Sequence, residues 1–334
     1  MKPALVCSLG LSLLTWAAAQ QPGDGAAVKA DRNIHQVVVT AIPRRDEGEP
    51  IERGSIVVQQ SGKNDNVRDW QPVNSHTTVD LAIIMDEDTQ NIGVQLGDVK
   101  KFITELPPNV RVGVGYMSAG AILFTQSAFT PDRNLVLLKL RLPSGGGNSS
   151  PSPYGSVQYL MQKWHPRPNQ IHEMLMISDG VEHLGGGNTQ NITLRKAVAD
   201  AVQAGVVVYA IAAPGPSGAV ASADGEPPPL SGPPDASFQP RREMPSAPAA
   251  VSSDRGIINL NELTDATGGV TYSGGNGTPA RFTDFLQDLL QRLNHQYLLT
   301  FESAKAPSGI VPIKIEVRAP DEKVTAPKQI VIAN

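Results

Sequence analysis

The sequence predicts an α/β fold: a doubly wound, mainly parallel sheet with one antiparallel edge strand, plus a small β-sandwich formed by N- and C-terminal strands. Three observations predict it. From Val79 onward, apolar runs alternate with segments of helical periodicity, which is typical of a parallel sheet covered by helices. The turn at residues 118–120 joins two strand-like runs, which predicts one antiparallel pair. Towards both ends of the chain the runs are strand-like.

The elements of the central region are expected in a regular order. Residues 79–85 are almost continuously apolar, as in a strand buried on both faces. A helical stripe from Leu96 to Leu106 ends at Pro107. The further expected strands are residues 110–117, 121–125, 174–177, 206–212 and 270–272. The further expected helices are a stripe at Leu135, Leu138 and Leu142, then residues 154–164, 194–204, 260–267 and 282–293.

Composition and pattern divide the chain into parts. The expected parts are a signal peptide at 1–19, a flexible leader at 20–33, an N-terminal β segment at 34–75, an α/β domain at 76–294 with a Pro-rich disordered insertion at 214–254, and a C-terminal β segment at 295–334. Neither β segment alone offers enough strands for a stable core. We therefore expect the two segments to join in one sandwich that clamps the central domain.

The N-terminus predicts export. Lys2 precedes a short apolar run, and Ala17 to Ala19 provide the small residues of a cleavage site. The run is too short to span a bilayer, so the expected product is a protein without a membrane span, secreted or periplasmic. Cys7, the single cysteine, lies inside this segment, so the mature chain is expected to have no disulfide or thiolate metal site.

Charge argues against nucleic acid as a partner. The full chain has 28 basic and 32 acidic residues, and loss of Lys2 leaves 27 against 32, a balance of −5. The chain carries no long basic block. The expected partner is instead a protein or a surface polymer.

Carboxylates follow two of the expected strands. Asp86 and Asp88 come directly after the first central strand, and Asp179 follows the strand at 174–177. Ligands of open parallel sheets bind beyond the C-terminal ends of the strands, so these side chains are expected at one edge. The serine-rich loop at residues 149–153 could supply a hydroxyl there. The other interpretation is that Asp86 and Asp88 only cap the following helix.

The order of these features resembles the von Willebrand factor A (vWA) domain. The resemblance covers residues 79–293 and rests on the strand with its Asp86 motif, the hairpin at 111–125, the serine-rich loop, the 174–180 strand, and the segment 263–272, "LTDATGGVTY". It is closest to vWA-related proteins of acidobacteria. It implies a Rossmann-like sheet and a module that binds proteins in adhesion.

The resemblance also implies a metal site of the adhesion type, in a degraded form. Asp86 fills the first ligand position and Asp179 the last. Asp88 and Gln90 stand where serines belong, and Ser152 or Ser150 replaces a threonine. Oxygen ligands of this kind suit Mg²⁺ or Ca²⁺. Three carboxylates would neutralise such an ion, which weakens its attraction for an acidic group on a partner.

Three functions compete on this basis. The leading hypothesis is a secreted, non-enzymatic binding module with or without a divalent ion. A second is a metal-dependent hydrolase using Asp86, Asp88 and Asp179, although no evident base accompanies them. A third is a metal-free structural component of a cell-envelope assembly.

Overall fold

The computed structural model describes residues 33–44, 51–89, 92–144, 152–164, 170–182, 190–213, 249–274, 282–303, 308–318 and 322–332. The expected signal peptide, all but the last residue of the leader, and residues 214–248 of the Pro-rich segment lie outside these ranges. Ser150 and Gln90 lie outside them as well. The interpretations of these segments stay predictions.

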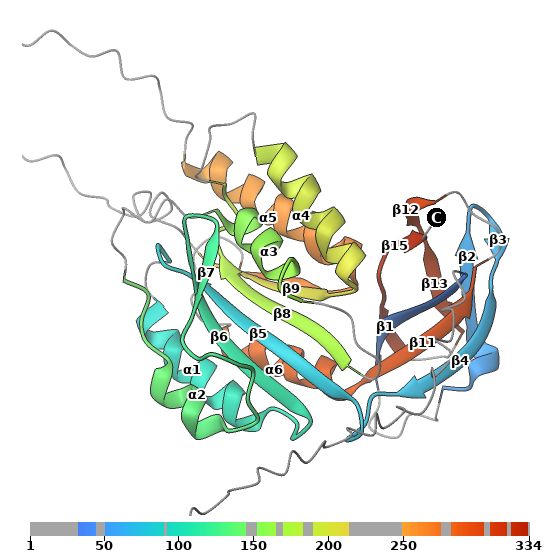
Figure 1. Ribbon diagram of the computed structural model, residues 1–334, viewed down its shortest axis with the longest axis horizontal. Coiled ribbons are helices and arrows are strands. Elements are labelled where there is room, and N and C mark those ends of the chain that lie inside the picture. Colours follow the sequence, from blue (N-terminus) through green and yellow to red (C-terminus); the bar gives the residue numbers. More distant parts are fainter. Residues whose placement is uncertain are drawn as a thin grey trace, which may run out of the picture. The chain divides into compact units, whose positions relative to one another are not determined.

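The central sheet has six strands in the order β10-β9-β8-β5-β6-β7 (Figure 1). Their bounds are β5 (Thr78–Asp86), β6 (Val110–Ser118), β7 (Ala121–Phe124), β8 (Gln170–Ser178), β9 (Val207–Ala212) and β10 (Thr271–Ser273). Every pair is parallel except β6 with β7. Eight of the nine residues of β5 are buried, which explains its almost unbroken apolar sequence. The predicted sheet with one antiparallel edge strand is confirmed.

Helices cover both faces of this sheet (Figure 1). One face packs against α1 (Ile92–Glu105), α2 (Arg133–Lys139) and α6 (Phe282–Asn294). The other packs against α3 (Pro153–Met161), α4 (Gln190–Ala204) and α5 (Ala249–Thr267). The strong stripe of α6 is buried as its spacing predicts, at Phe282, Leu286, Leu289 and Leu293.

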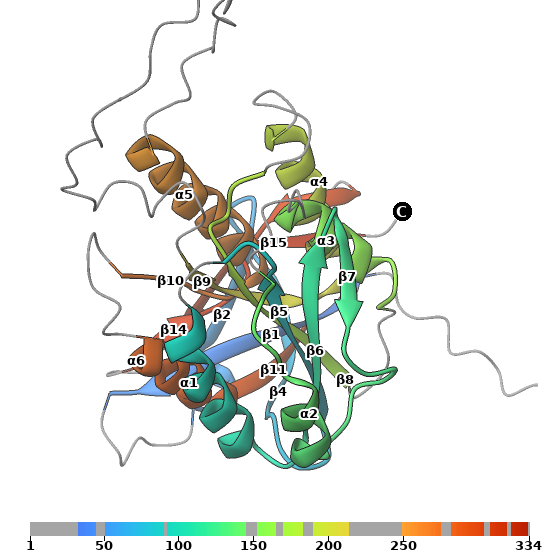
Figure 2. The ribbon, with the colours of Figure 1, turned by 90° about the vertical axis from the view of Figure 1, so that its left-hand side faces the viewer.

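A tight turn joins β6 to β7, which run side by side in opposite directions (Figure 2). Ala119 and Gly120 both adopt positive φ, 48° and 76°. Such a pair is typical of a two-residue hairpin turn whose twist matches that of the strands. A side chain on Gly120 would lie close to Ser152 and Gly155, so the turn packs against the start of α3.

Strands from the two ends of the chain share antiparallel sheets, as predicted. The four-stranded sheet has the order β14-β1-β11-β4, and a three-stranded sheet the order β13-β2-β3. Their bounds, with the pair β12-β15, are β1 (Ile34–Pro43), β2 (Ile56–Gln60), β3 (Lys63–Asn64), β4 (Asn66–Pro72), β11 (Gln296–Glu302), β12 (Gly309–Pro312), β13 (Lys314–Val317), β14 (Glu322–Thr325) and β15 (Gln329–Ile332). A 3-10 turn, η1 (Arg53–Ser55), precedes β2. These sheets enclose one apolar core, which we call the sandwich core.

Two helix predictions need correction. The predicted helix is present as α2, but its leucine stripe does not face the core, because Leu138 is 82% exposed and Leu135 and Leu142 are also exposed. The helix instead buries Val136, and Leu140 follows it into the core. Secondly, α5 begins at Ala249 rather than near residue 260, so the last residues assigned to the Pro-rich insertion are helical. Their Ala and Ser residues are compatible with a helix once the prolines end.

Candidate functional site

The ends of β5 and β8 bring the predicted acidic residues to one edge of the sheet, which we call the rim. The two strands are parallel neighbours, with Met85 beside Ile177. Asp86 therefore lies next to Ser178, whose hydroxyl donates to Asp86 Oδ2 at 3.1 Å. The Asp88 amide donates to Asp86 Oδ1 at 3.0 Å. Asp86 thus receives hydrogen bonds from its own loop and from the neighbouring strand.

The electrostatics of Asp86 show that the carboxylates are close together. Burial, together with the charges of Asp179 and Asp88, raises the pKa of Asp86 to about 6. The hydrogen bonds from the Asp88 amide and the Ser178 hydroxyl act in the opposite direction. Asp86 is 3% exposed, so little water compensates the repulsion. The rim therefore brings the carboxylates of Asp88 and Asp179 close enough to Asp86 to disfavour its charged form.

Ser152 ties the start of α3 to the loop after β8. Its hydroxyl accepts from the Gly155 amide at 3.2 Å, the contact of a helix N-cap. The same hydroxyl donates to Glu182 Oε2 at 2.8 Å. Both side chains are buried. Ser152 therefore lies next to an acidic side chain of the rim, and its hydroxyl also caps the start of α3.

Glu87 was missed in the sequence, and it fixes a third loop at the rim. Arg141 donates to both of its carboxylate oxygens, and the amide and hydroxyl of Ser144 donate to Oε2 at 2.6 and 2.7 Å. Burial raises the pKa of Glu87, but these hydrogen bonds outweigh burial and lower it. Arg141 also lies 3.8 Å from the centroid of the Tyr116 ring. In the sequence, only the acidic run at 86–88 pointed to Glu87. Its partner Arg141 is 54 residues away, so no local pattern links the two.

Helix α5 packs directly against the loop that carries Asp179. A Cβ atom on Gly256 would lie 1.9 Å from the Asp179 carbonyl oxygen. Gly180 has φ of +70°, and a Cβ there would meet the Gly256 carbonyl at 2.5 Å. Tyr154 donates to the Gly180 carbonyl at 2.7 Å. Gly180 thus allows α5 to approach the loop closely. The loop contacts two helices, α5 through Gly256 and α3 through Tyr154.

The oxygen atoms at the rim are of the chemical type that coordinates a hard cation. They are oxygens of Asp86, Asp88, Asp179, Ser152 and Glu182, and the buried Thr89 hydroxyl beside them has no hydrogen-bond partner among the described residues. No group of three acidic, histidine or cysteine side chains that could hold a metal ion is found within the described ranges. The metal ligands stay a prediction, and Gln90 cannot be placed.

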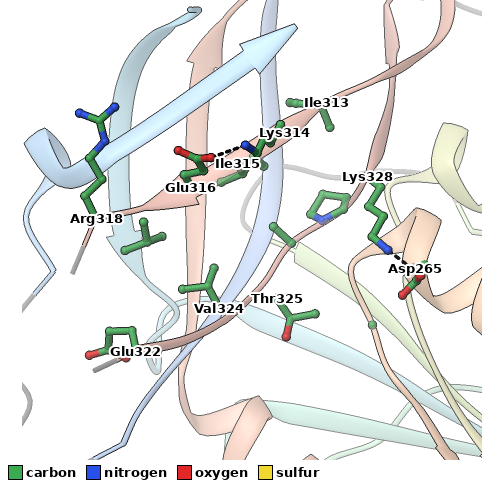
Figure 3. A pocket seen from close by; sticks show the side chains of 14 residues that line it. Asp265, Ile313, Lys314, Ile315, Glu316, Arg318, Glu322, Val324, Thr325 and Lys328 are labelled. Atoms are coloured by element: carbon green, nitrogen blue, oxygen red, sulfur yellow. Dashed lines mark hydrogen bonds and ion pairs between the residues drawn. The ribbon is translucent and has the colours of Figure 1, made fainter. Parts of the chain in front are cut away.

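A separate cavity of about 560 Å³ lies between the edge strands β13 and β14 (Figure 3). Lys314 pairs with Glu316 at 2.5 Å, and Lys328 with Asp265 of α5 at 2.6 Å. The lining residues come from the C-terminal segment and the region around the end of α5, not from the rim.

The sheet order and the helices on both faces agree with the expected family fold. The central region has a vWA-like fold. No protein-family model matches the chain, and no curated protein matches it. The proposed closeness of this vWA-like chain to acidobacterial proteins stays a prediction.

Several solved structures are similar to this vWA-like chain. An aerotolerance-related membrane protein from Bacteroides fragilis is 16% identical, with coverage of 65% of this chain and 98% of that one and a TM-score of 0.42. A von Willebrand factor type A protein from Catenulispora acidiphila is 9% identical, with 82% and 75% covered and a TM-score of 0.38. The ArnB paralog VWA2 from Sulfolobus acidocaldarius is 8% identical, with 90% and 76% covered and a TM-score of 0.40.

No helix in the described part of the chain has both the length and the apolar character needed to cross a membrane.

Proposed function

We propose that this chain is an exported, non-enzymatic interaction module that binds a protein or surface polymer at the acidic rim. The observation that carries the proposal is the way separate loops are fixed around Asp86. Ser178 reaches Asp86 from β8, Arg141 reaches Glu87, and Ser152 reaches Glu182. Binding sites gain affinity when their groups are held in place before the ligand arrives.

The charge of the rim indicates the chemistry of the ligand. Asp86 is buried beside Asp88 and Asp179, so a positive charge brought to the rim removes repulsion. Either a cationic group of the partner or a divalent ion can provide it. With Mg²⁺ or Ca²⁺ bound, an oxygen of the partner could complete the coordination, although the three carboxylates weaken the attraction for an acidic group.

A thermal melt separates these two cases. The mature chain is measured in EDTA and then with Mg²⁺, Ca²⁺ or Mn²⁺, alongside Asp179→Asn. If a cation is held at the rim, it raises the melting midpoint of the wild type and not of the variant, because binding to the folded state stabilises it. Equal midpoints with and without every cation would remove the metal and leave a cationic partner.

Sedimentation with envelope fragments of the source cells tests the binding role. Wild-type protein is expected to sediment with the fragments, and Asp179→Asn and Glu182→Gln to be retained at least tenfold less. The exposed Glu262→Gln on α5 is the matched control. Retention of all four proteins to the same degree would contradict binding at the rim and favour a structural role through another surface.

A further inference from the structure

A buried polar cluster joins the central sheet to the four-stranded sheet, away from the rim. Glu173 lies on β8 and is fully buried. Gln296 is the first residue of β11, where the chain leaves α6, and is 2% exposed. Its side-chain nitrogen donates to Glu173 Oε1, and to the Tyr209 hydroxyl of β9 at 3.1 Å. The cluster therefore connects elements of both parts of the molecule.

Two atoms of this cluster have no hydrogen-bond partner among the described residues. They are Glu173 Oε2 and Gln296 Oε1, and both are buried. Leaving a buried polar atom unpaired is costly, and leaving two on adjoining side chains is more so. An ionised carboxylate only accepts hydrogen bonds, and so does an amide oxygen. No arrangement of an ionised Glu173 can pair these two atoms with each other.

One proton satisfies both atoms. If Glu173 Oε2 carries it, the acid donates to Gln296 Oε1 while the amide nitrogen of Gln296 continues to donate to Glu173 Oε1. We propose that Glu173 is protonated in the folded protein and forms this acid–amide pair with Gln296, and that the pair fastens β11 to β8 until rising pH removes the proton.

The surroundings of Glu173 favour the neutral acid. Leu81 of β5 and Val207 of β9 are its strand neighbours. The other polar groups of the cluster are the hydroxyls of Tyr209 and, on β1, Thr40. Two charged residues of α6, Arg292 and Asp288, pair with each other at 2.6 Å, and Asp288 also accepts from the Tyr272 hydroxyl of β10. The third, Asp284, lies in the first turn of the helix.

The pH range follows from this environment. Burial raises the pKa of Glu173 from its ordinary 4.5 to about 7, against the opposing hydrogen bonds of Gln296 and Tyr209. Between pH 4.5 and about 7, Glu173 therefore keeps its proton in the folded state and has lost it in the unfolded state. The contribution to stability is complete below about pH 4.5 and is lost as pH rises to about 7.

Carbon-13 NMR of the full mature chain tests the protonation directly. The carboxyl carbon of Glu173 is assigned in the wild type through its bonds to the other carbons of the same residue, and it is followed from pH 4 to 9. A midpoint between about pH 6 and 8 is expected, since one proton is shared in a buried pair. A midpoint within about half a unit of 4.5 would overturn the proposal, and this measurement needs no stable variant.

Unfolding by urea tests the role of the pair. In Glu173→Gln an amide replaces the acid and can make both hydrogen bonds at every pH. We compare the unfolding equilibrium constant of the wild type with that of the variant. Between pH 5 and 7 the ratio of the two constants should rise by up to about tenfold for each pH unit. Glu262→Gln should keep the wild-type dependence. Identical pH dependence of wild type and Glu173→Gln would sink the idea.

Discussion

Asp86 shows, at the scale of one residue, that the rim is built at the expense of stability. It is buried beside two other carboxylates, and burial is the largest cause of its raised pKa. Folding therefore becomes less favourable as pH rises from 3.8 to about 6, since the folded state binds the proton more tightly. A residue that only shaped the loop would not need to carry this charge. Retention of such a charge is typical of a functional site.

Asp86→Asn should consequently stabilise the protein in the presence of EDTA. The amide keeps an acceptor for the Asp88 amide and removes the repulsion from Asp179. We expect a gain of about 1–3 kcal/mol at pH 7 that shrinks towards zero near pH 4, measured by urea unfolding. Asp98→Asn on α1 is the control, with a change under about 0.5 kcal/mol. A less stable Asp86→Asn at pH 7 would contradict the electrostatic account.

The rim residues were only partly predictable from the sequence. Asp86, Asp88 and Asp179 were found because strand ends in a parallel sheet share an edge. Glu182 and Arg141 were missed, because what places them is the path of two loops rather than a strand register. Ser152 was predicted as a ligand; it caps α3 and donates to Glu182, and its role as a ligand stays a prediction.

At the scale of elements, α5 holds the loop of Asp179 in place by the close approach of Gly256. Gly256 lets the helix approach the Asp179 carbonyl so closely that even a methyl group does not fit. Alanine normally stabilises a helix interior by about 1 kcal/mol relative to glycine. Here it must push the loop away, so Gly256→Ala should destabilise the protein by about 1–3 kcal/mol.

Gly97→Ala on α1 is the matched control, since no atom lies within 4 Å of the added Cβ. It should stabilise by about 0.5–1 kcal/mol in the same urea titration. If both substitutions stabilise the protein equally, the close contact between α5 and the rim is wrong.

The elements themselves were largely readable from the chain, and the failures have physical causes. The four central strands β5, β6, β8 and β9 were clear because nearly all of their residues are buried. The leucines of α2 misled because a helical spacing does not say which side faces the core, and Val136 is the buried residue. The start of α5 was missed because small and polar residues carry no apolar period.

At the scale of the whole molecule, the central region depends on strands from the two ends of the chain. Val38 and Leu298 complete the core beneath α6, and Val331 packs against the other core. Thr325 accepts from the buried Arg292 at 3.0 Å. A fragment of residues 76–294 loses all four residues.

That fragment should melt at least about 10 °C below the full mature chain, since the loss of several kcal/mol shifts the midpoint by roughly 2–4 °C for each kcal/mol in a domain of this size. Differential scanning calorimetry of both proteins at the same concentration is the measurement. Equal midpoints would show that the terminal strands are accessory.

The sandwich core is made only of residues from the two terminal segments. Every residue of the sandwich core lies before residue 73 or after residue 295. The two connections to the central region also leave the sheet side by side, since Pro72 of β4 pairs with Tyr297 of β11. The vWA-like region is thus inserted between the two segments that form the sandwich core. A short hairpin could replace this insert, provided that Val38 and Leu298, which pack against it, are exchanged for polar residues.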